Sequence, residues 1–393
     1  MPKSRSLPVL LGLLWLVGNA LRLPILAVPP VIPALRSEFD LSGTDIGILT
    51  GIPVILFAAA ALVGSRLVAR CGVVAAVMTG LILTALGSAL RGVTPNVLTL
   101  FAATAVMGAG IAVTQPALPA LVGQWLPQRI ALGTGIYTNG LLIGEVLPVA
   151  SFPLLFALFG QSWRATFVLW AIPVLAIAFI LMVVAPREGT APKAVPRHWW
   201  PHWPARDVWR LGLIFAGASA LYFGSNAFLP GYLTEANRPD LISPALTALN
   251  LGQLPASLFL ISFARRLEGK AWPFVLAGVL AIASILVMVT STGASTIASA
   301  AVLGFAAGGG FALGLTLPPL LSPPQEVARV SAAMFTISYT IAMLVCVLSG
   351  AAWDLTGAAR FAFVPIALSA IPTILLVLTV RFDRKPNVVA QGE

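Results

Sequence analysis

Two ionisable residues of this 393-residue chain are embedded in apolar sequence. Arg22 and Glu145 each lie near the middle of a long apolar run, whereas the other charged residues fall between such runs or at their ends. A charged side chain at the centre of a bilayer costs about 2.5–3.5 kcal/mol on insertion scales, so such a residue faces a polar cavity and has a partner. These two residues therefore predict a functional site inside a membrane.

Arg22 is compatible with three roles. In the first it binds an anionic substrate, because a guanidinium offers several donors in a planar fork and stays charged. In the second it only neutralises Glu145 as a structural pair. In the third it alternates, releasing Glu145 when an anion arrives.

Glu145 has two alternative roles. A carboxylate at this depth can carry a proton across the membrane, which would couple transport to protons. Alternatively, it is the permanent counter-charge of Arg22 and never titrates. The neighbouring Gly140 and Gly144, four residues apart, predict close packing of this helix against another.

Uncharged polar residues at similar depth are further candidates. Asn19 is three residues before Arg22 and shares its helix face, and Tyr222 and Asn226 belong to one polar stripe of another helix. Each such residue is also compatible with a plain hydrogen bond between helices. The substrate-binding residues that we predict are Arg22, Asn19, Tyr222, Asn226, Gln115, Tyr137, Asn139, Gln253 and Tyr339, with Glu145 as the proton-coupling group or the partner of Arg22.

Other chemistry is not indicated by the sequence. Both histidines lie outside the apolar runs and Glu145 is the only carboxylate within one, so no catalytic set and no enzyme are expected. Cys71 and Cys346 have no metal-ligand spacing and predict no disulfide. We expect no metal and no cofactor, and without a phosphate loop no ATP-driven pump.

The composition determines which elements position these residues. Hydrophobic residues make up 59% of the chain and charged residues 9%, roughly a third of the charge in a soluble domain. The apolar runs are continuous, which excludes an outer-membrane barrel. Since a helix needs about 20 apolar residues to cross the hydrocarbon core, we predict an all-α polytopic membrane protein with twelve transmembrane helices, at 7–35, 46–67, 73–90, 97–121, 132–156, 166–184, 208–229, 243–263, 272–290, 297–321, 330–352 and 361–380.

The loop charges support this count. With both termini on one side, that side carries 17 lysines and arginines and the other carries 5, among them Arg91. The positive-inside rule then predicts both termini in the cytoplasm, in a bacterial-type inner membrane. Because the net charge of +10 lies in these loops and not on one face, we expect membrane lipids and no nucleic acid as partners.

An internal repeat divides the chain into two halves. The segment GAGIA at 108–112 matches GGGFA at 308–312, and RATFV at 164–168 resembles RFAFV at 360–364. Two parallel repeats place a substrate site at their interface near the midplane. We therefore predict six-helix bundles at 1–184 and 208–393, joined by a cytoplasmic linker at 185–207. The linker's cluster of His198, His202 and tryptophans is either an interfacial aromatic belt or a set of ligands or pH sensors.

The chain resembles the major facilitator superfamily, and within it the branch of cyanate permeases and nitroimidazole transporters. The segments that carry this resemblance are NALRLP at 19–24, LTGIPV at 49–54, GAGIA at 108–112 with Pro116 and Pro119, Tyr137-Thr138, Gly160, Trp163-Arg164, Tyr339 and WDLTG at 353–357. The resemblance implies two pseudo-symmetric bundles, a cavity lined by helices one, four, seven and ten, helix five beside helix one, and a monomer. It also implies that Arg22 occupies an anion-handling position.

One loop departs from the superfamily pattern. In SRLVARCG at 65–72 the acidic residue of the usual signature is replaced by Ala69. In the superfamily that acid helps to latch one conformation. The latch of this chain is therefore either weak or built from other groups.

These observations predict a secondary transporter of a small organic or inorganic anion that works by alternating access, coupled to protons or to exchange. The alternative is efflux of small aromatic or nitro-heterocyclic compounds, with Arg22 neutralised by Glu145 and the ligand held by aromatics such as Phe57, Tyr222 and Tyr339. A cavity of zero formal charge suits this alternative.

Overall fold

The computed structural model describes residues 6–186, 203, 205–267, 269–291, 293–323, 326–380 and 382. Every regular element within these residues is helical, which confirms the all-α prediction. The elements are α1 Leu7–Leu26, η1 Pro29–Val31, α2 Ile32–Phe39, α3 Gly43–Cys71, α4 Val73–Arg91, α5 Val97–Trp125, α6 Ile130–Leu158, α7 Trp163–Val184, α8 Arg206–Glu235, η2 Pro239–Leu241, α9 Ile242–Leu251, α10 Gln253–Leu267, α11 Trp272–Thr290, α12 Ala294–Leu321, α13 Val327–Thr356, η3 Ala359–Ala362, α14 Phe363–Leu368 and α15 Ala370–Val377.

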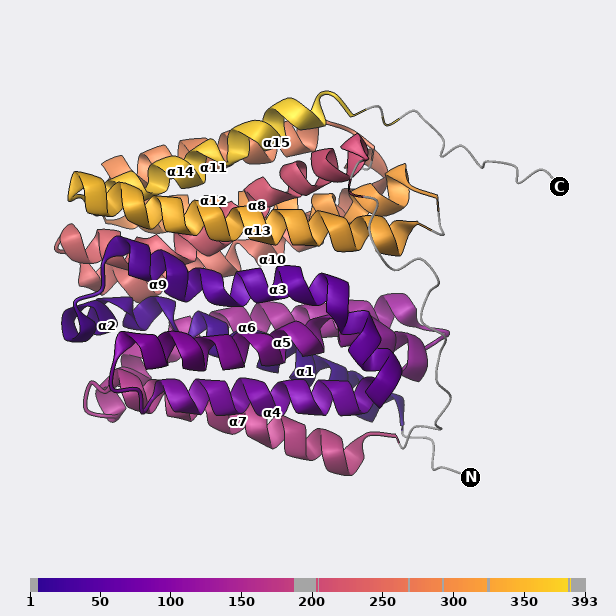
Figure 1. Ribbon diagram of the computed structural model, residues 1–393. Coiled ribbons are helices and arrows are strands. Elements are labelled where there is room, and N and C mark those ends of the chain that lie inside the picture. The colour runs from indigo at the N-terminus through magenta and orange to yellow at the C-terminus, as the bar shows by residue number, and fades with distance from the viewer. Residues whose placement is uncertain are drawn as a thin grey trace.

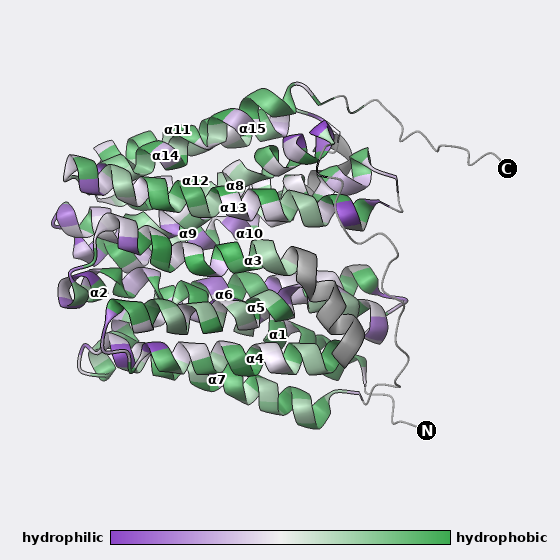
Figure 2. Ribbon diagram, viewed as in Figure 1, coloured by the Kyte–Doolittle hydropathy of each residue, from purple (hydrophilic) through white to green (hydrophobic). Residues whose placement is uncertain are grey.

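The molecule has the hydropathy of a polytopic membrane protein. Apolar residues cover the length of the helices and polar residues gather mostly at the two ends (Figure 2). Within the described residues, 11 helical segments are long and apolar enough to cross a membrane. The remaining predicted span, 243–263, is split at Gly252 into α9 and α10. A side chain at Gly252 would collide with the backbone carbonyl of Ala301 on α12, so this position needs glycine.

The helices form two groups, α1–α7 and α8–α15, which lie one above the other in Figure 1. Within the first group α1 packs along α6 and α4 along α5, while in the second α13 packs along α8. The groups meet mainly where α3 packs along α13 and where α6 packs against α9. Most of the segment that we expect to link them, 187–202 and 204 with His198 and His202, lies outside the described residues, so the domain limits stay a prediction.

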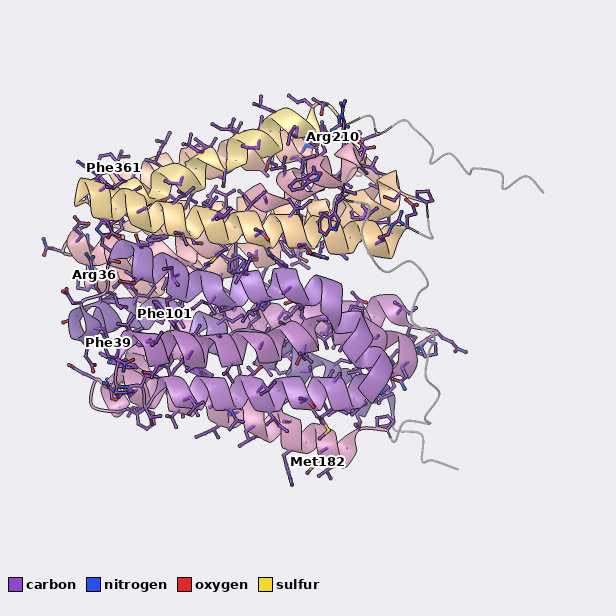
Figure 3. The ribbon with its side chains drawn as sticks, in the orientation of Figure 1. Arg36, Phe39, Phe101, Met182, Arg210 and Phe361 are labelled. Atoms are coloured by element: carbon purple, nitrogen blue, oxygen red, sulfur yellow. The ribbon has the colours of Figure 1, made fainter. Side chains whose placement is uncertain are left out.

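The two ends of the molecule along the helices are named after residues that lie there. We call them the Leu7 end, where α1 begins, and the Asp354 end, where α13 finishes. Arg36, Phe39 and Phe361 lie at the Asp354 end, and Met182 and Arg210 lie at the Leu7 end (Figure 3).

At the Asp354 end the first turn of α3 is capped by a carboxylate from the other group. Asp354 Oδ1 accepts a hydrogen bond from Gly43 N (2.6 Å), and its Oδ2 accepts from Thr44 N (2.8 Å) and Thr44 Oγ1 (2.6 Å). An anion at a helix N-terminus satisfies free N–H groups and opposes the helix dipole. The adjacent Trp353 ring also lies 4.0 Å from the guanidinium carbon of Arg36. This contact therefore joins the two groups through charge as well as packing.

Two further hydrogen bonds join the groups closer to the middle of the helices. Ser243 Oγ donates to the carbonyl of Val149 (2.7 Å), and Thr336 Oγ1 donates to the carbonyl of Ala58 (3.1 Å). The described hydrogen bonds between the groups thus run from the Asp354 end to about mid-depth.

Candidate functional site

Arg22 lies on α1 shortly before that helix is interrupted. Pro24 lies inside the helix, and Pro29 and Pro30 follow its end at Leu26. Proline removes a backbone donor and disfavours continuation of a helix, which explains the break. Arg22 is only 8% exposed, and Asn19, one turn earlier, is also buried.

Glu145 reaches Arg22 because α1 and α6 approach very closely. A side chain at Gly140 would collide with the carbonyl of Trp15, and one at Gly144 would collide with the carbonyl of Asn19 and lie 3.1 Å from Arg22 Cβ. The predicted close packing through Gly140 and Gly144 is therefore present, as expected for small residues at a membrane helix interface.

Arg22 and Glu145 form an ion pair in the interior. Arg22 Nε lies 3.2 Å from Glu145 Oε1, and Glu145 is 4% exposed. The other carboxylate oxygen, Oε2, accepts a hydrogen bond from Gln253 Nε2 (2.7 Å). Since Gln253 is the first residue of α10, directly after the break at Gly252, the Glu145 carboxylate connects the two groups of helices.

Tyrosines from the second group complete the surroundings of the pair. The Tyr222 hydroxyl of α8 interacts electrostatically with both Glu145 and Arg22. Tyr339 of α13 interacts with Arg22 and with Gln115 of α5. The structure therefore brings six of the predicted residues together with Glu145, namely Arg22, Asn19, Tyr222, Gln253, Tyr339 and Gln115.

The site contains hydrogen-bond donors without partners. Arg22 Nη1 and Asn19 Nδ2 are buried and make no hydrogen bond within the described part of the chain, and the Tyr222 hydroxyl beside them faces the Glu145 carboxylate. A buried polar group left unsatisfied costs about 1–3 kcal/mol. Donors gathered beside a guanidinium suit a ligand that brings several acceptor atoms, such as a carboxylate or another small anion.

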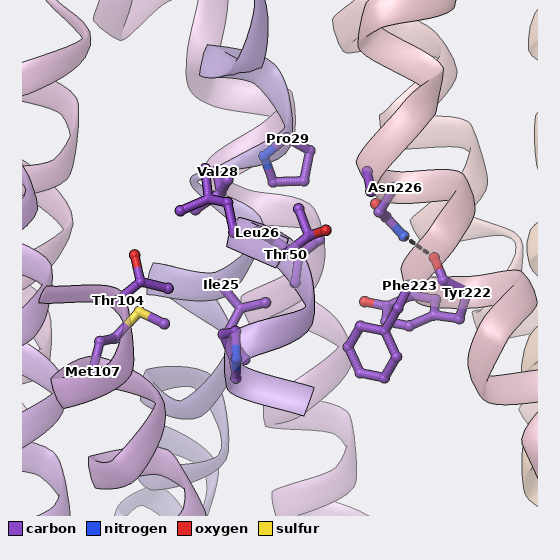
Figure 4. A pocket seen from close by; sticks show the side chains of 13 residues that line it. Ile25, Leu26, Val28, Pro29, Thr50, Thr104, Met107, Tyr222, Phe223 and Asn226 are labelled. Atoms are coloured by element: carbon purple, nitrogen blue, oxygen red, sulfur yellow. Dashed lines mark hydrogen bonds between the residues drawn. The ribbon is translucent and has the colours of Figure 1, made fainter. Parts of the chain in front are cut away.

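Asn226 lies close to this site but makes hydrogen bonds between and within helices. Its Nδ2 donates to the Tyr222 carbonyl (2.9 Å), and its Oδ1 accepts from Asn250 Nδ2 (3.0 Å). Asn226, Tyr222 and Phe223 also line a small cavity of about 30 Å³ between α8 and helices α1, α3 and α5 (Figure 4). Its other lining residues are mostly apolar, among them Ile25 and Met107.

Two predicted residues on α6 lie apart from the ion pair. The Asn139 side chain is exposed and its Oδ1 accepts a hydrogen bond from Trp15 Nε1 (2.9 Å). Tyr137 is half-buried, interacts with Thr138 and packs against α1, where its carbonyl approaches Gly18. Their role in substrate binding stays a prediction.

Arg91 counts among the charges at the ends of the apolar runs, but the structure shows that its side chain is buried. It is the last residue of α4, is 0% exposed, and donates through Nη2 to the carbonyl of Pro24 (2.8 Å). Because the apolar run ends at Leu90, the sequence predicts that Arg91 lies at the membrane surface and not in the protein interior. The only available signal was Ser88, one turn earlier, whose hydroxyl lies 3.3 Å from Arg91 Nη2.

Comparison with known proteins places this geometry in a family context. The sequence model of the family described as the Major Facilitator Superfamily matches residues 14–345 of this chain. The cyanate transport protein CynX of Escherichia coli (strain K12) is 27% identical over 380 residues, covering 95% of this chain and 97% of that protein. The 2-nitroimidazole transporter of the same organism is 25% identical over 360 residues, covering 89% of each. The crystal structure of a D-xylose-proton symporter is 13% identical and superposes with a TM-score of 0.75 over 97% of this chain and 100% of that one.

Proposed function

Because the chain belongs to the Major Facilitator Superfamily and is a multi-pass membrane transporter, we propose that it moves a small anion by alternating access, with Arg22 as the anion-binding group. The observation that carries this proposal is the set of unpartnered buried donors around Arg22, at the level where the two groups of helices meet. Glu145 then carries the proton, and its carboxylate is released from Arg22 when an anion binds Arg22 in place of that carboxylate.

The chemistry of the relatives supports a small ligand with several acceptors. One is named for cyanate, an anion with an acceptor atom at each end, and another for 2-nitroimidazole, whose nitro group has two acceptor oxygens. Such groups match the fork of a guanidinium together with one or two further donors. We therefore propose cyanate-sized or carboxylate-bearing anions as the substrate class.

Efflux of small aromatic or nitro-heterocyclic compounds is the second candidate. The pairing of Arg22 with Glu145 gives the site zero formal charge, and an aromatic cluster adjoins it. The Tyr339 ring lies 5.8 Å from that of Phe57, 5.7 Å from Phe335 and 6.3 Å from Phe223, measured between centroids. The ring faces of such an aromatic cluster offer an apolar surface on which a flat ligand can stack.

The charge distribution supports an orientation in a bacterial-type inner membrane. The side with 17 lysines and arginines would be cytoplasmic, which places the Asp354 end on the outer side. The structure then corresponds to a state closed to the outside. We propose a monomer as the working unit, since both helix groups that form the site come from one chain.

The substrate class is tested by thermal unfolding of the detergent-purified protein with cyanate, nitrate, acetate, benzoate and 2-nitroimidazole. A ligand at 100 times its Kd stabilises the folded state by about 2.7 kcal/mol. We expect at least one small anion to raise the Tm of wild-type protein. Stabilisation by 2-nitroimidazole alone, with no response to any anion, would replace the anion proposal with the efflux candidate.

Asp354 is expected to hold the outer side closed. Replacing it with Asn removes one acceptor oxygen and the charge that cap α3, and hydrogen bonds to a charged group contribute about 1.5–3 kcal/mol. We predict that Asp354→Asn raises the population open at this end by about tenfold. Spin labels on the exposed residues Ser37 and Asn237, in a variant without native cysteines, would report this as a longer distance.

The matched control is Asp240→Asn, because Asp240 pairs with Arg238 (3.0 Å) on the surface of the second group alone. It should leave the distance distribution unchanged. If Asp354→Asn gives the same distribution as wild type, the carboxylate cap does not hold the two groups together.

A further inference from the structure

Arg91 is a buried cation that has no role in the transport mechanism proposed above. Its side chain is fully buried, and its Nε and Nη1 make no hydrogen bond within the described residues. It also has no carboxylate within ion-pair distance there. Burying a guanidinium without a counter-ion costs several kcal/mol, so its place in the fold calls for a reason other than stability.

The backbone carbonyl to which the Arg91 side chain donates a hydrogen bond lies at the break in α1. The Pro24 carbonyl would normally accept from the N–H four residues later, but Val28 N donates to the Ile25 carbonyl instead (3.2 Å). Arg91 Nη2 takes the vacant place at 2.8 Å. A cation at a helix C-terminus satisfies a free carbonyl and opposes the negative end of the helix dipole.

Arg91 is itself held firmly by two neighbouring helices. Its guanidinium carbon lies 4.3 Å from the ring centroid of Phe167 on α7. Ser88 Oγ lies 3.3 Å from Arg91 Nη2 and donates to the Phe167 carbonyl (3.0 Å). These contacts tie the end of α1 to α4 and α7, on the side of α1 away from the second group of helices.

The segment after the break is anchored to the same scaffold. Glu38 of α2 accepts hydrogen bonds from Arg164 Nη1 (2.8 Å) and Nη2 (2.5 Å) and from Trp163 Nε1 (2.6 Å), all at the start of α7. Both sides of the interruption between α1 and α2 are thus held by arginine contacts that involve α7.

We propose that Arg91 is a positioning residue for Arg22. Arg22 lies two residues before Pro24, in the turn of α1 that Arg91 fixes. Without this anchor the interrupted end of α1 can shift or unwind, and the Arg22 guanidinium moves relative to Glu145 and Asn19. This inference rests on the proposed function, because the effect is read through anion binding.

The test compares Arg91→Met, Arg91→Gln and Arg91→Lys, with cyanate, nitrate and acetate as probes in thermal unfolding and in transport. Arg91→Met fills the place of the arginine stem with an apolar side chain and removes the donor. We expect its anion Kd and KM to rise about tenfold or more at a similar maximal rate. Arg91→Lys, which can still donate to Pro24, should stay within about threefold of wild type. If Arg91→Met does not fold, Arg91→Gln replaces it, with an expected loss of at least fivefold.

Two controls separate positioning from general stability. Arg360→Met removes an exposed arginine at the same end of the second group and should leave the anion Kd unchanged. In an Arg22→Lys background, Arg91→Met should cost less affinity than in wild type, because Arg91 acts through Arg22. An equal loss in both backgrounds, or a folded Arg91→Met protein with wild-type Kd, overturns the positioning role. If no anion binds wild-type protein, the proposed function fails first and this inference fails with it.

Discussion

Arg22→Ala is expected to abolish anion binding and anion transport. The substitution removes the charged donor that the described residues place at the site, and truncating one partner of a buried charge pair, here Arg22 with a bound anion, costs about 2–5 kcal/mol or more. The apparent Kd for the anion should therefore rise at least about 30-fold. Arg22→Lys keeps the charge but loses the planar fork, so it should retain partial binding. Thermal unfolding with the anions that stabilise wild type measures both effects.

The control for this prediction addresses folding. Arg22→Ala leaves Glu145 buried without its cation, which costs about 3–5 kcal/mol where a buried pair is broken. The double variant Arg22→Ala with Glu145→Gln removes both charges and should recover most of that stability without recovering anion binding. A folded Arg22→Ala protein that responds to anions like wild type would show that Arg22 has only a structural role.

Glu145→Gln is expected to separate anion movement from the proton gradient. The amide can still accept from Gln253 but cannot carry a proton, and Arg22 no longer has a competing carboxylate. Anion exchange should continue, whereas accumulation driven by a pH difference should disappear. For one proton per anion, a pH difference of one unit allows about tenfold accumulation. Proteoliposomes with and without an imposed pH difference measure the ratio.

Glu326→Gln is the matched control, because Glu326 pairs with Arg329 (2.8 Å) three residues later in the chain and away from the site. It should accumulate anion like wild type. Tenfold accumulation by Glu145→Gln would show that the carboxylate is only the counter-charge of Arg22.

The ion pair between Arg22 and Glu145 could be predicted from the sequence. An arginine and a glutamate at mid-depth in two apolar runs need each other, since neither can remain alone in hydrocarbon. Gly140 and Gly144 indicated the close helix contact that brings the pair together. The hydrogen bond from Gln253 to Glu145 was not predictable in this form, because it depends on the interruption at Gly252, and a single glycine in an apolar run does not reveal a break.

The position of Asn139 around its helix follows from its spacing to Glu145. It is six residues before Glu145, which at 100° per residue places it about 120° away around α6. Depth in the membrane alone makes both residues candidates for the site. In the structure Asn139 accepts a hydrogen bond from Trp15, on a different face of α6 from Glu145, and its role in substrate binding stays a prediction.

The burial of Arg91 could not be predicted from the sequence. A basic residue at the end of an apolar run reads as a loop charge under the positive-inside rule, and only tertiary structure reveals that the side chain turns inward to the Pro24 carbonyl. The acceptor is a backbone group freed by a helix break in another part of the chain. Residue type and spacing do not contain that information.

The most direct test of the account is counterflow of radiolabelled cyanate in proteoliposomes that contain only this protein. We predict uptake of label into vesicles preloaded with unlabelled cyanate. Uptake should be lost in the stabilised Arg22→Ala, Glu145→Gln double variant and kept in Glu145→Gln alone. Equal uptake by the two variants, or exchange of labelled 2-nitroimidazole without any exchange of cyanate, would contradict an anion site at Arg22.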